Sequence, residues 1–108
     1  MKLPVEVFGD TVVVHTPEEL AADQADGFLA FVSSLPQNQV VLDLDNTENF
    51  DSAGLTAMCE LADRLRESGG DVKFATNSVL NRKILEITRL DQQFEIYDSV
   101  VDAVKSFR

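Results

Sequence analysis

The chain has 108 residues, of which 44% are hydrophobic and 26% are charged, and its formal net charge is −10. This length fits one domain, and the composition is that of a folded globular protein rather than a disordered one. The negative charge argues against nucleic acid and anionic membranes as binding partners, because both attract clustered lysine and arginine. A basic protein partner, or simple solubility, fits the charge better.

The sequence shows no segment that would insert into a membrane and no set of residues that would hold zinc. No apolar run approaches the roughly 20 residues needed to span a bilayer, and the first residues lack the apolar core of a secretory signal, so we expect a cytoplasmic protein. Cys59 is the only cysteine and His15 the only histidine, so they cannot form an intrachain disulfide or a structural zinc site. We expect Cys59 in the core and His15 at a strand end or on the surface.

The N-terminal part of the chain predicts a β-hairpin, a helix and a buried strand. Two β-rich runs within residues 5–15 flank Gly9-Asp10, and a two-residue loop with glycine first is typical of a type II′ turn. Residues 16–19, Thr-Pro-Glu-Glu, predict the start of a helix, with a cap, an early proline and acids in the first turn. This helix would end before Pro36. Residues 39–44 are then typical of a short buried strand.

Residues 53–75 predict the second helix and the strand after it. Leu55, Met58, Cys59, Ala62 and Leu65 fall on one face of a helix over residues 53–67. Gly69-Gly70 is expected to end that helix, and residues 71–75 form the next strand.

The C-terminal third predicts a third helix, a short strand and a final helix. Asn77 or Ser78 would cap the third helix, whose apolar residues would point inward: Leu80, Ile84, Leu85 and Ile87. Residues 94–97 predict the last strand. Asp98 would cap the final helix, which carries Val100, Val101, Val104 and Phe107.

This order of elements, β-β-α-β-α-β-α-β-α, predicts an α/β fold. Strands separated by helices indicate a mostly parallel sheet, and the opening hairpin adds one antiparallel strand, so the sheet should be mixed. Ligand sites in such sheets lie at the carboxyl ends of the strands. The loop over residues 45–52 lies at such an end and is the longest strand-to-helix connection, which makes it the candidate functional loop.

The sequence Asp51-Ser52-Ala53-Gly54 at the end of this loop allows three interpretations. Asp51 or Ser52 could simply cap the second helix. Ser52 could be a nucleophile, as in an esterase, but a nucleophile elbow has glycine where this chain has Phe50. The only histidine, His15, lies at the end of a strand in a different part of the pattern, so activation of Ser52 by an adjacent base is unsupported. Ser52 could also be phosphorylated, because a helix N-terminus accommodates a phosphate. The neighbouring acids, Asp45, Glu48 and Asp51, would make that phosphate disruptive to an interface.

Three groups of residues together resemble the STAS domain family, specifically the bacterial anti-sigma factor antagonists. The first is the strand at residues 40–44 followed by residues 51–55, Asp-Ser-Ala-Gly-Leu. The second is Gly69-Gly70 before a strand. The third is residues 84–91 followed by 94–99 and the final helix. The resemblance covers about residues 5–107 and implies a single STAS domain over residues 1–108.

The resemblance implies a protein-binding switch rather than an enzyme. Ser52 corresponds to the residue that a partner anti-sigma factor, a serine kinase, phosphorylates, and Asp51 is its neighbouring acid. The partner would bind at Asp51, Ser52, Ala53, Gly54 and Thr56 when Ser52 is unmodified, and a phosphatase would reverse the modification. ATP and magnesium belong to the kinase, so the chain itself needs no cofactor.

Two departures from the family pattern lie near this site. The family often has Gly-Glu-Leu-Asp after the second strand, whereas residues 16–20 here read Thr-Pro-Glu-Glu-Leu, so Glu18 or Glu19 would have to replace the missing acid. Asn49 stands where an apolar residue is usual. The family also includes STAS subunits of transporters, lipid-transport machinery and stress-signalling complexes. In that alternative role the chain would dock constitutively and Ser52 would be only a cap.

Overall fold

The computed structural model describes residues 1–107, which form a mixed sheet with helices on both faces. The sheet has the order β1-β2-β4-β6-β7, and a separate two-stranded ribbon pairs β3 with β5. The strands are β1 (Val5–Phe8), β2 (Thr11–His15), β3 (Glu19–Leu20), β4 (Gln39–Asp43), β5 (Asn49–Phe50), β6 (Asp71–Ala75) and β7 (Ile96–Tyr97). The helices are α1 (Ala22–Ser33), α2 (Ser52–Glu67), α3 (Val79–Ile87) and α4 (Val100–Ser106), with a 3₁₀ turn at Leu90–Gln92.

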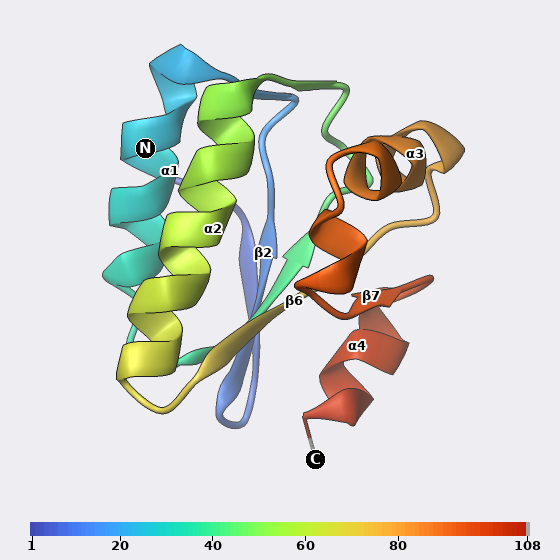
Figure 1. Cartoon of the computed structure of the whole chain (residues 1–108). Coiled ribbons are helices and arrows are strands. Elements are labelled where there is room, and N and C mark those ends of the chain that lie inside the picture. The colour runs from blue at the N-terminus through green and yellow to red at the C-terminus, as the bar shows by residue number, and fades with distance from the viewer. Residues whose placement is uncertain (108) are drawn as a thin grey trace.

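The predicted α/β architecture is confirmed. Strands β2, β4, β6 and β7 are parallel to one another, and β1 is antiparallel to β2. Gly9 has φ +63° in the hairpin turn, as the first central residue of a type II′ turn requires. Helices α1 and α2 lie side by side on one face of the sheet, and α4 lies on the other (Figure 1).

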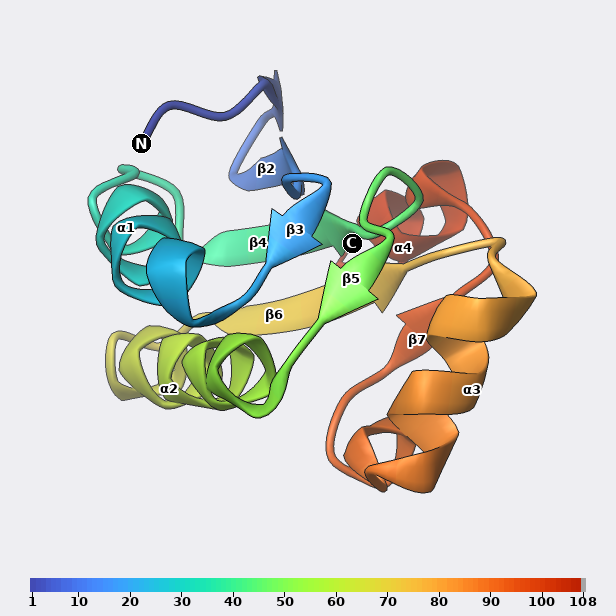
Figure 2. The ribbon, with the colours of Figure 1, turned by 90° about the horizontal axis from the view of Figure 1, so that it is seen from above.

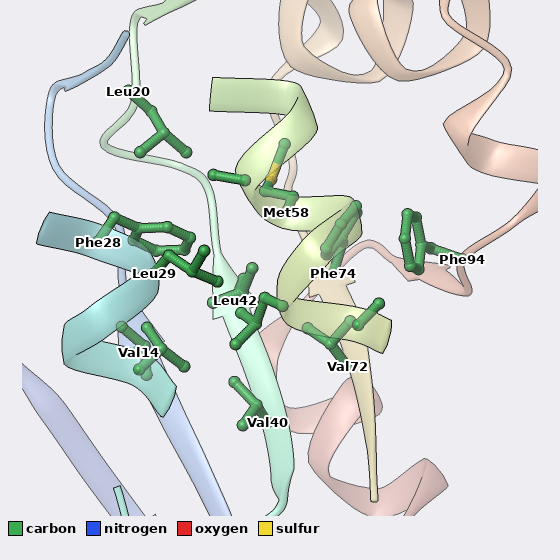
Figure 3. Close-up of a cluster of buried hydrophobic side chains, with 14 of the residues drawn as sticks. Val14, Leu20, Phe28, Leu29, Val40, Leu42, Met58, Val72, Phe74 and Phe94 are labelled. Atoms are coloured by element: carbon green, nitrogen blue, oxygen red, sulfur yellow. The ribbon is translucent and has the colours of Figure 1, made fainter. Parts of the chain in front are cut away.

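Alternation along the strands divides the core into two layers. Side chains of Val12, Val14, Val40, Leu42, Val72 and Phe74 point toward α1 and α2, and Figure 3 shows several of them meeting Phe28, Leu29 and Met58. The residues between them, Val13, Val41 and Ala75, point toward Ala103 and Val104 of α4. This period of two is what a sheet covered on both faces requires.

The predicted position of Cys59 is confirmed. Its side chain packs against the α1–α2 layer of the core, and burial raises the pKa of its thiol above the ordinary value of 9.0. A thiol that stays protonated is a poor nucleophile, which is consistent with a packing role.

The predicted helix start at residues 16–19 is wrong, because these residues form a connection and a short strand. The hydroxyl of Thr16 turns inward and donates to the carbonyl of Asp43 (2.9 Å) instead of capping a helix. The carbonyl of Glu18 accepts from the amides of Glu48 and Asn49. These long-range bonds hold Glu19–Leu20 in an extended strand, and α1 begins only at Ala22.

The last third of the chain differs from expectation in two details and agrees with it in a third. The strand at residues 94–97 is limited to Ile96–Tyr97. Ser99, not Asp98, caps α4 by accepting from the amide of Asp102, while Asp98 pairs with Arg82. Ser78 caps α3 as one of the two predicted residues.

The orientation of α3 was also predicted incorrectly. Its buried residues are Asn81 and Leu85, whereas two of the residues expected inside, Leu80 and Ile87, are exposed. Val101 of α4 is exposed as well.

Candidate functional site

The candidate loop ends at Asp51, whose carboxylate caps two helices at once. One oxygen, Oδ1, accepts from the amide of Gly54 at 3.0 Å and caps α2. The other, Oδ2, accepts from the amide of Ala22, the first residue of α1, also at 3.0 Å. Helix α1 needs this help because the residue before it, Ala21, has no side-chain oxygen. The bond from Gly54, followed by the one from Ala22, lowers the pKa of Asp51 below 3.8 despite partial desolvation.

Ser52 is the first residue of α2, and its side chain is exposed. Of the two cap candidates in the sequence, Asp51 therefore performs the capping. Within residues 1–107, the Ser52 hydroxyl forms no hydrogen bond. The structure thus leaves this hydroxyl without a capping role, at the positive end of the α2 dipole.

Gly54 fixes the position of Ser52 through close packing against β3. A Cβ atom at Gly54 would lie 2.0 Å from the carbonyl oxygen of Leu20, so the first turn of α2 contacts the β3 backbone directly. Gly54 is buried and cannot itself contact a partner. Figure 2 shows the β3–β5 ribbon lying at the end of the sheet where α2 begins.

A groove between α1 and α2 opens beside Ser52. It has a volume of about 290 Å³ and is lined by Ala22, Ala25, Asp26, Leu29, Ser52, Ala53, Thr56, Ala57 and Glu60. Small side chains keep the two helices close, and the exposed carboxylates of Asp26 and Glu60 stand on opposite helices. Ser52 and Thr56 therefore share one surface on α2, with Ala53 partly buried between them. A larger hollow of about 720 Å³ lies far from Ser52, around the hairpin turn and the end of α2.

The candidate functional loop is anchored to neighbouring elements by buried polar groups that sequence reasoning missed. The side-chain Nδ2 of Asn81 on α3 donates to the carbonyls of Leu44 (2.9 Å) and Thr47 (3.0 Å). The hydroxyl of Thr47 donates to the carbonyl of Pro17 and also contacts Thr16. Asp45, expected near Ser52, instead accepts from the side chain of Thr76 and the amide of Asn77. The sequence signal that could have revealed this anchor is a polar residue, Asn81, on the buried face of a helix.

The two candidates for the missing family acid lie on or beside the β3–β5 ribbon. Glu19 is the register partner of Asn49 in this parallel pairing. Glu18 binds the loop through its backbone carbonyl. Both side chains are exposed. The pairing brings this segment next to the strand that leads directly into Asp51 and Ser52.

His15 does not act on Ser52, because both of its ring nitrogens are engaged elsewhere. Nδ1 lies 2.8 Å from Asp43 and Nε2 lies 2.8 Å from Glu6. Burial lowers the pKa of His15, but its hydrogen bonds and the charges of the two carboxylates outweigh this effect and raise it above 6.5. His15 also shares the sheet face of Val13, on the α4 side, whereas α2 covers the opposite face. This geometry gives Ser52 no base of the kind an esterase needs.

Residues 1–107 contain neither a candidate metal site nor a helix that could span a membrane. No group of three or more His, Cys, Asp or Glu residues is arranged to hold a metal ion. None of the helices in this part of the chain is long and apolar enough to cross a membrane.

Comparison with known proteins agrees with this architecture. A Thermotoga maritima protein provisionally named an anti-sigma factor antagonist is 25% identical over 109 residues, which cover 97% of this chain and 96% of that protein. A crystal structure of a Thermotoga maritima protein with the same provisional name has a TM-score of 0.85 and 24% identity, covering 96% of this chain and 92% of that one.

The Bacillus cell fate determinant SpoIIAA, solved in its phosphorylated form, has a TM-score of 0.75 and 18% identity, covering 99% of this chain and 100% of that one. The two structural likenesses show the fold. The family model described as STAS domain matches residues 2–103. The chain therefore belongs to the STAS domain family.

Proposed function

We propose that this chain is an anti-sigma factor antagonist whose binding is switched by phosphorylation of Ser52. With Ser52 unmodified, the chain sequesters an anti-sigma factor kinase in the cytoplasm and thereby releases the sigma factor. The kinase, which binds ATP and magnesium, phosphorylates Ser52 and ends the complex. A phosphatase restores the binding-competent form.

The observation that carries this proposal is that Asp51, and not Ser52, caps the helices, which leaves Ser52 exposed. Asp51 caps both α1 and α2, so the Ser52 hydroxyl is not needed for helix capping. A residue that served only as a cap would direct its oxygen at the helix amides. Instead, Ser52 is exposed at the start of α2 and lines the α1–α2 groove. A kinase can reach this hydroxyl without unfolding the helix.

A phosphate at Ser52 is compatible with the fold and harmful to an interface. The N-terminus of α2 favours an anion, so the helix tolerates the modification. The phosphate adds about −1.5 to −2 charges beside the ionised carboxylate of Asp51, in a chain whose net charge is already −10. It also stands at the edge of the groove that Thr56 lines. Charge and bulk together exclude a partner that packs closely over this surface. The likeness to SpoIIAA, which is known in a phosphorylated form, supports this mechanism.

The proposed partner surface consists of Asp51, Ser52, Ala53 and Thr56, with Gly54 acting by positioning. Asp26 and Glu60 flank the groove from α1 and α2, which suits a partner that places a cationic side chain there. Glu18 or Glu19, at the β3–β5 ribbon, replaces the family's missing acid in contacting the same partner.

The experiment is a phosphorylation assay with each anti-sigma factor kinase of the source organism, purified and supplied with ATP and magnesium. We expect the intact mass of the chain to increase by one phosphate, which fragmentation assigns to Ser52. Ser52→Ala should abolish the modification, and Ser33→Ala, at an exposed serine at the far end of α1, should leave it. Phosphate on another residue, or on Ser52→Ala, would contradict the proposal.

The alternative function, constitutive docking, makes the opposite prediction for Ser52→Asp, a substitution that mimics the charge of a phosphate. If the chain were a fixed subunit of a transporter, lipid-transport or stress-signalling assembly, Ser52→Asp would leave partner binding unchanged. A switch requires Ser52→Asp to weaken binding to the kinase while Ser52→Ala retains it. Comparing these two variants in one binding assay separates the two functions.

A further inference from the structure

Helices α1 and α2 begin next to each other and run in the same direction along one face of the sheet (Figure 1). They are parallel because each connects two strands of the parallel set, α1 between β2 and β4 and α2 between β4 and β6. The N-terminus of a helix carries a partial positive charge. Two such ends that lie side by side repel each other unless a negative group neutralises both.

The carboxylate of Asp51 is that negative group, because each of its oxygens binds one helix. Oδ1 accepts from the amide of Gly54 in the first turn of α2, and Oδ2 accepts from the amide of Ala22 at the start of α1. The first turn of α2 reads Ser-Ala-Gly-Leu, so this turn supplies no acid of its own to neutralise the helix end. A single side chain thus links two helix starts, across 29 residues of sequence.

The hydrogen bond between Asp51 and Ala22 is the polar contact that fixes the start of α1. Helix α2 begins with Gly54 packed directly against the carbonyl of Leu20, so its position is set by backbone contact. Helix α1 is preceded by Ala21, whose side chain cannot cap it. Beyond the chain connection from β3, the position of the start of α1 therefore depends on Asp51.

This hydrogen bond lies at the mouth of the groove beside Ser52. The groove, of about 290 Å³, is lined at this end by Ala22 and Ala53, and small side chains on both helices leave the space between them open. Larger apolar side chains pack the two helices together further along, where Phe28 and Met58 are buried. The opening beside Ser52 therefore has the width that the bond to Ala22 imposes.

We propose that Asp51 is a positioning residue that shapes the partner-binding groove by holding α1 in place. Its carboxylate sets the distance and angle of α1 relative to Ser52, and so the width of the surface onto which the partner packs. This inference rests on the proposed function, because it assigns Asp51 a role in that same surface. The contribution of Asp51 to binding passes through α1 and does not require direct contact with the partner.

Asp51→Asn tests this role, because asparagine has one acceptor oxygen where aspartate has two. Asparagine caps a helix about as well as aspartate does, so it can still accept from Gly54. Its NH₂ group then faces the amide of Ala22, and two donors form no hydrogen bond. If the asparagine accepts from Ala22 instead, Gly54 loses its acceptor. In either orientation the link between the two helices is broken, and the negative charge between their ends is lost.

The test measures helix orientation, partner affinity and stability on one set of variants. NMR residual dipolar couplings give the orientation of α1 relative to α2 in the chain alone, and titration into a purified anti-sigma factor kinase gives the affinity. We expect Asp51→Asn to reorient α1 and to weaken binding about tenfold. Adding Ala21→Ser gives α1 a cap of its own without rebuilding the link to α2. In this double variant the urea midpoint should recover, whereas the orientation and the affinity should not.

Asp23→Asn is the matched control, because it removes the same charge at an exposed position in the first turn of α1. It should leave the orientation and the affinity at their wild-type values. The proposal is overturned if Asp51→Asn keeps the wild-type orientation or affinity, if Asp23→Asn has an equal effect, or if Ala21→Ser restores affinity together with stability. Failure of the proposed function gives a different result: the wild-type chain binds no anti-sigma factor kinase, while the couplings still show α1 displaced in Asp51→Asn and support its positioning role.

Discussion

Replacing Gly54 with alanine tests how the candidate site is positioned. The added Cβ would lie 2.0 Å from the Leu20 carbonyl oxygen, whereas ordinary van der Waals contact begins at 3.4 Å. Helix α2 or strand β3 must therefore move by more than 1 Å, against backbone atoms that are paired with β5. Overpacking of this kind costs about 1–3 kcal/mol. The gain in helix propensity is at most about 1 kcal/mol, so we expect a net loss of about 1–2 kcal/mol.

Gly27→Ala is the matched control for this prediction. Gly27 also lies inside a helix, but a Cβ there would meet only Met1 side-chain atoms at 3.5 and 3.7 Å, which is ordinary contact. The same change should therefore stabilise the protein by up to about 1 kcal/mol. Urea unfolding gives both values if the slope with denaturant is unchanged. Equal or greater stability of Gly54→Ala relative to wild type would refute the packing explanation.

Three further substitutions test other polar contacts. Stability should fall as pH rises above the ordinary His15 pKa of 6.5, because the His15 contribution is complete below that value and is lost as pH rises through the raised folded-state pKa. His15→Gln should remove this pH-dependent component of the unfolding free energy measured with urea, and an unchanged pH profile would contradict the assignment. Asn81→Ala should cost about 1–3 kcal/mol, since two buried carbonyls lose their donor, and an unchanged urea midpoint would show that the anchor is unimportant. Lys73→Met should lower the free energy of unfolding by about 1.5–3 kcal/mol and speed amide hydrogen exchange in α4, because Lys73 donates to the carbonyl and hydroxyl of Ser106 at the end of that helix. The same change at exposed Lys105 should alter neither quantity.

The order of strands and helices could be predicted because each depends on local pattern. Short β-rich apolar runs identified β2 and β4, and a single apolar face identified α2. The failure at residues 16–19 involves partners distant in sequence. Residues 16–19 have good helix-start chemistry, yet Glu18 is bonded across 30 residues to Glu48. Tertiary hydrogen bonds thus override a local signal that is individually worth about 1 kcal/mol.

The sequence predicted that the candidate site lies at the start of α2, but it did not predict the hydrogen bonds that Asp51 forms there. Asp51 and Ser52 were recognised as alternative caps, and the structure assigns capping to Asp51. That the same carboxylate also caps α1 depends on a contact 29 residues away, which no local pattern contains. The exposure of Leu80 was missed for a related reason. Periodicity identifies an apolar face, but it does not say whether the fold covers it.

The central claim, that phosphate on Ser52 controls partner binding, is tested most directly by measuring the affinity of two forms of one protein. Wild-type chain is prepared unmodified and quantitatively phosphorylated on Ser52, and each form is titrated calorimetrically into the same purified anti-sigma factor kinase. We predict that the unmodified form binds and that phosphorylation weakens binding by at least about 100-fold, equivalent to about 2.7 kcal/mol. Equal affinities for the two forms would contradict the account.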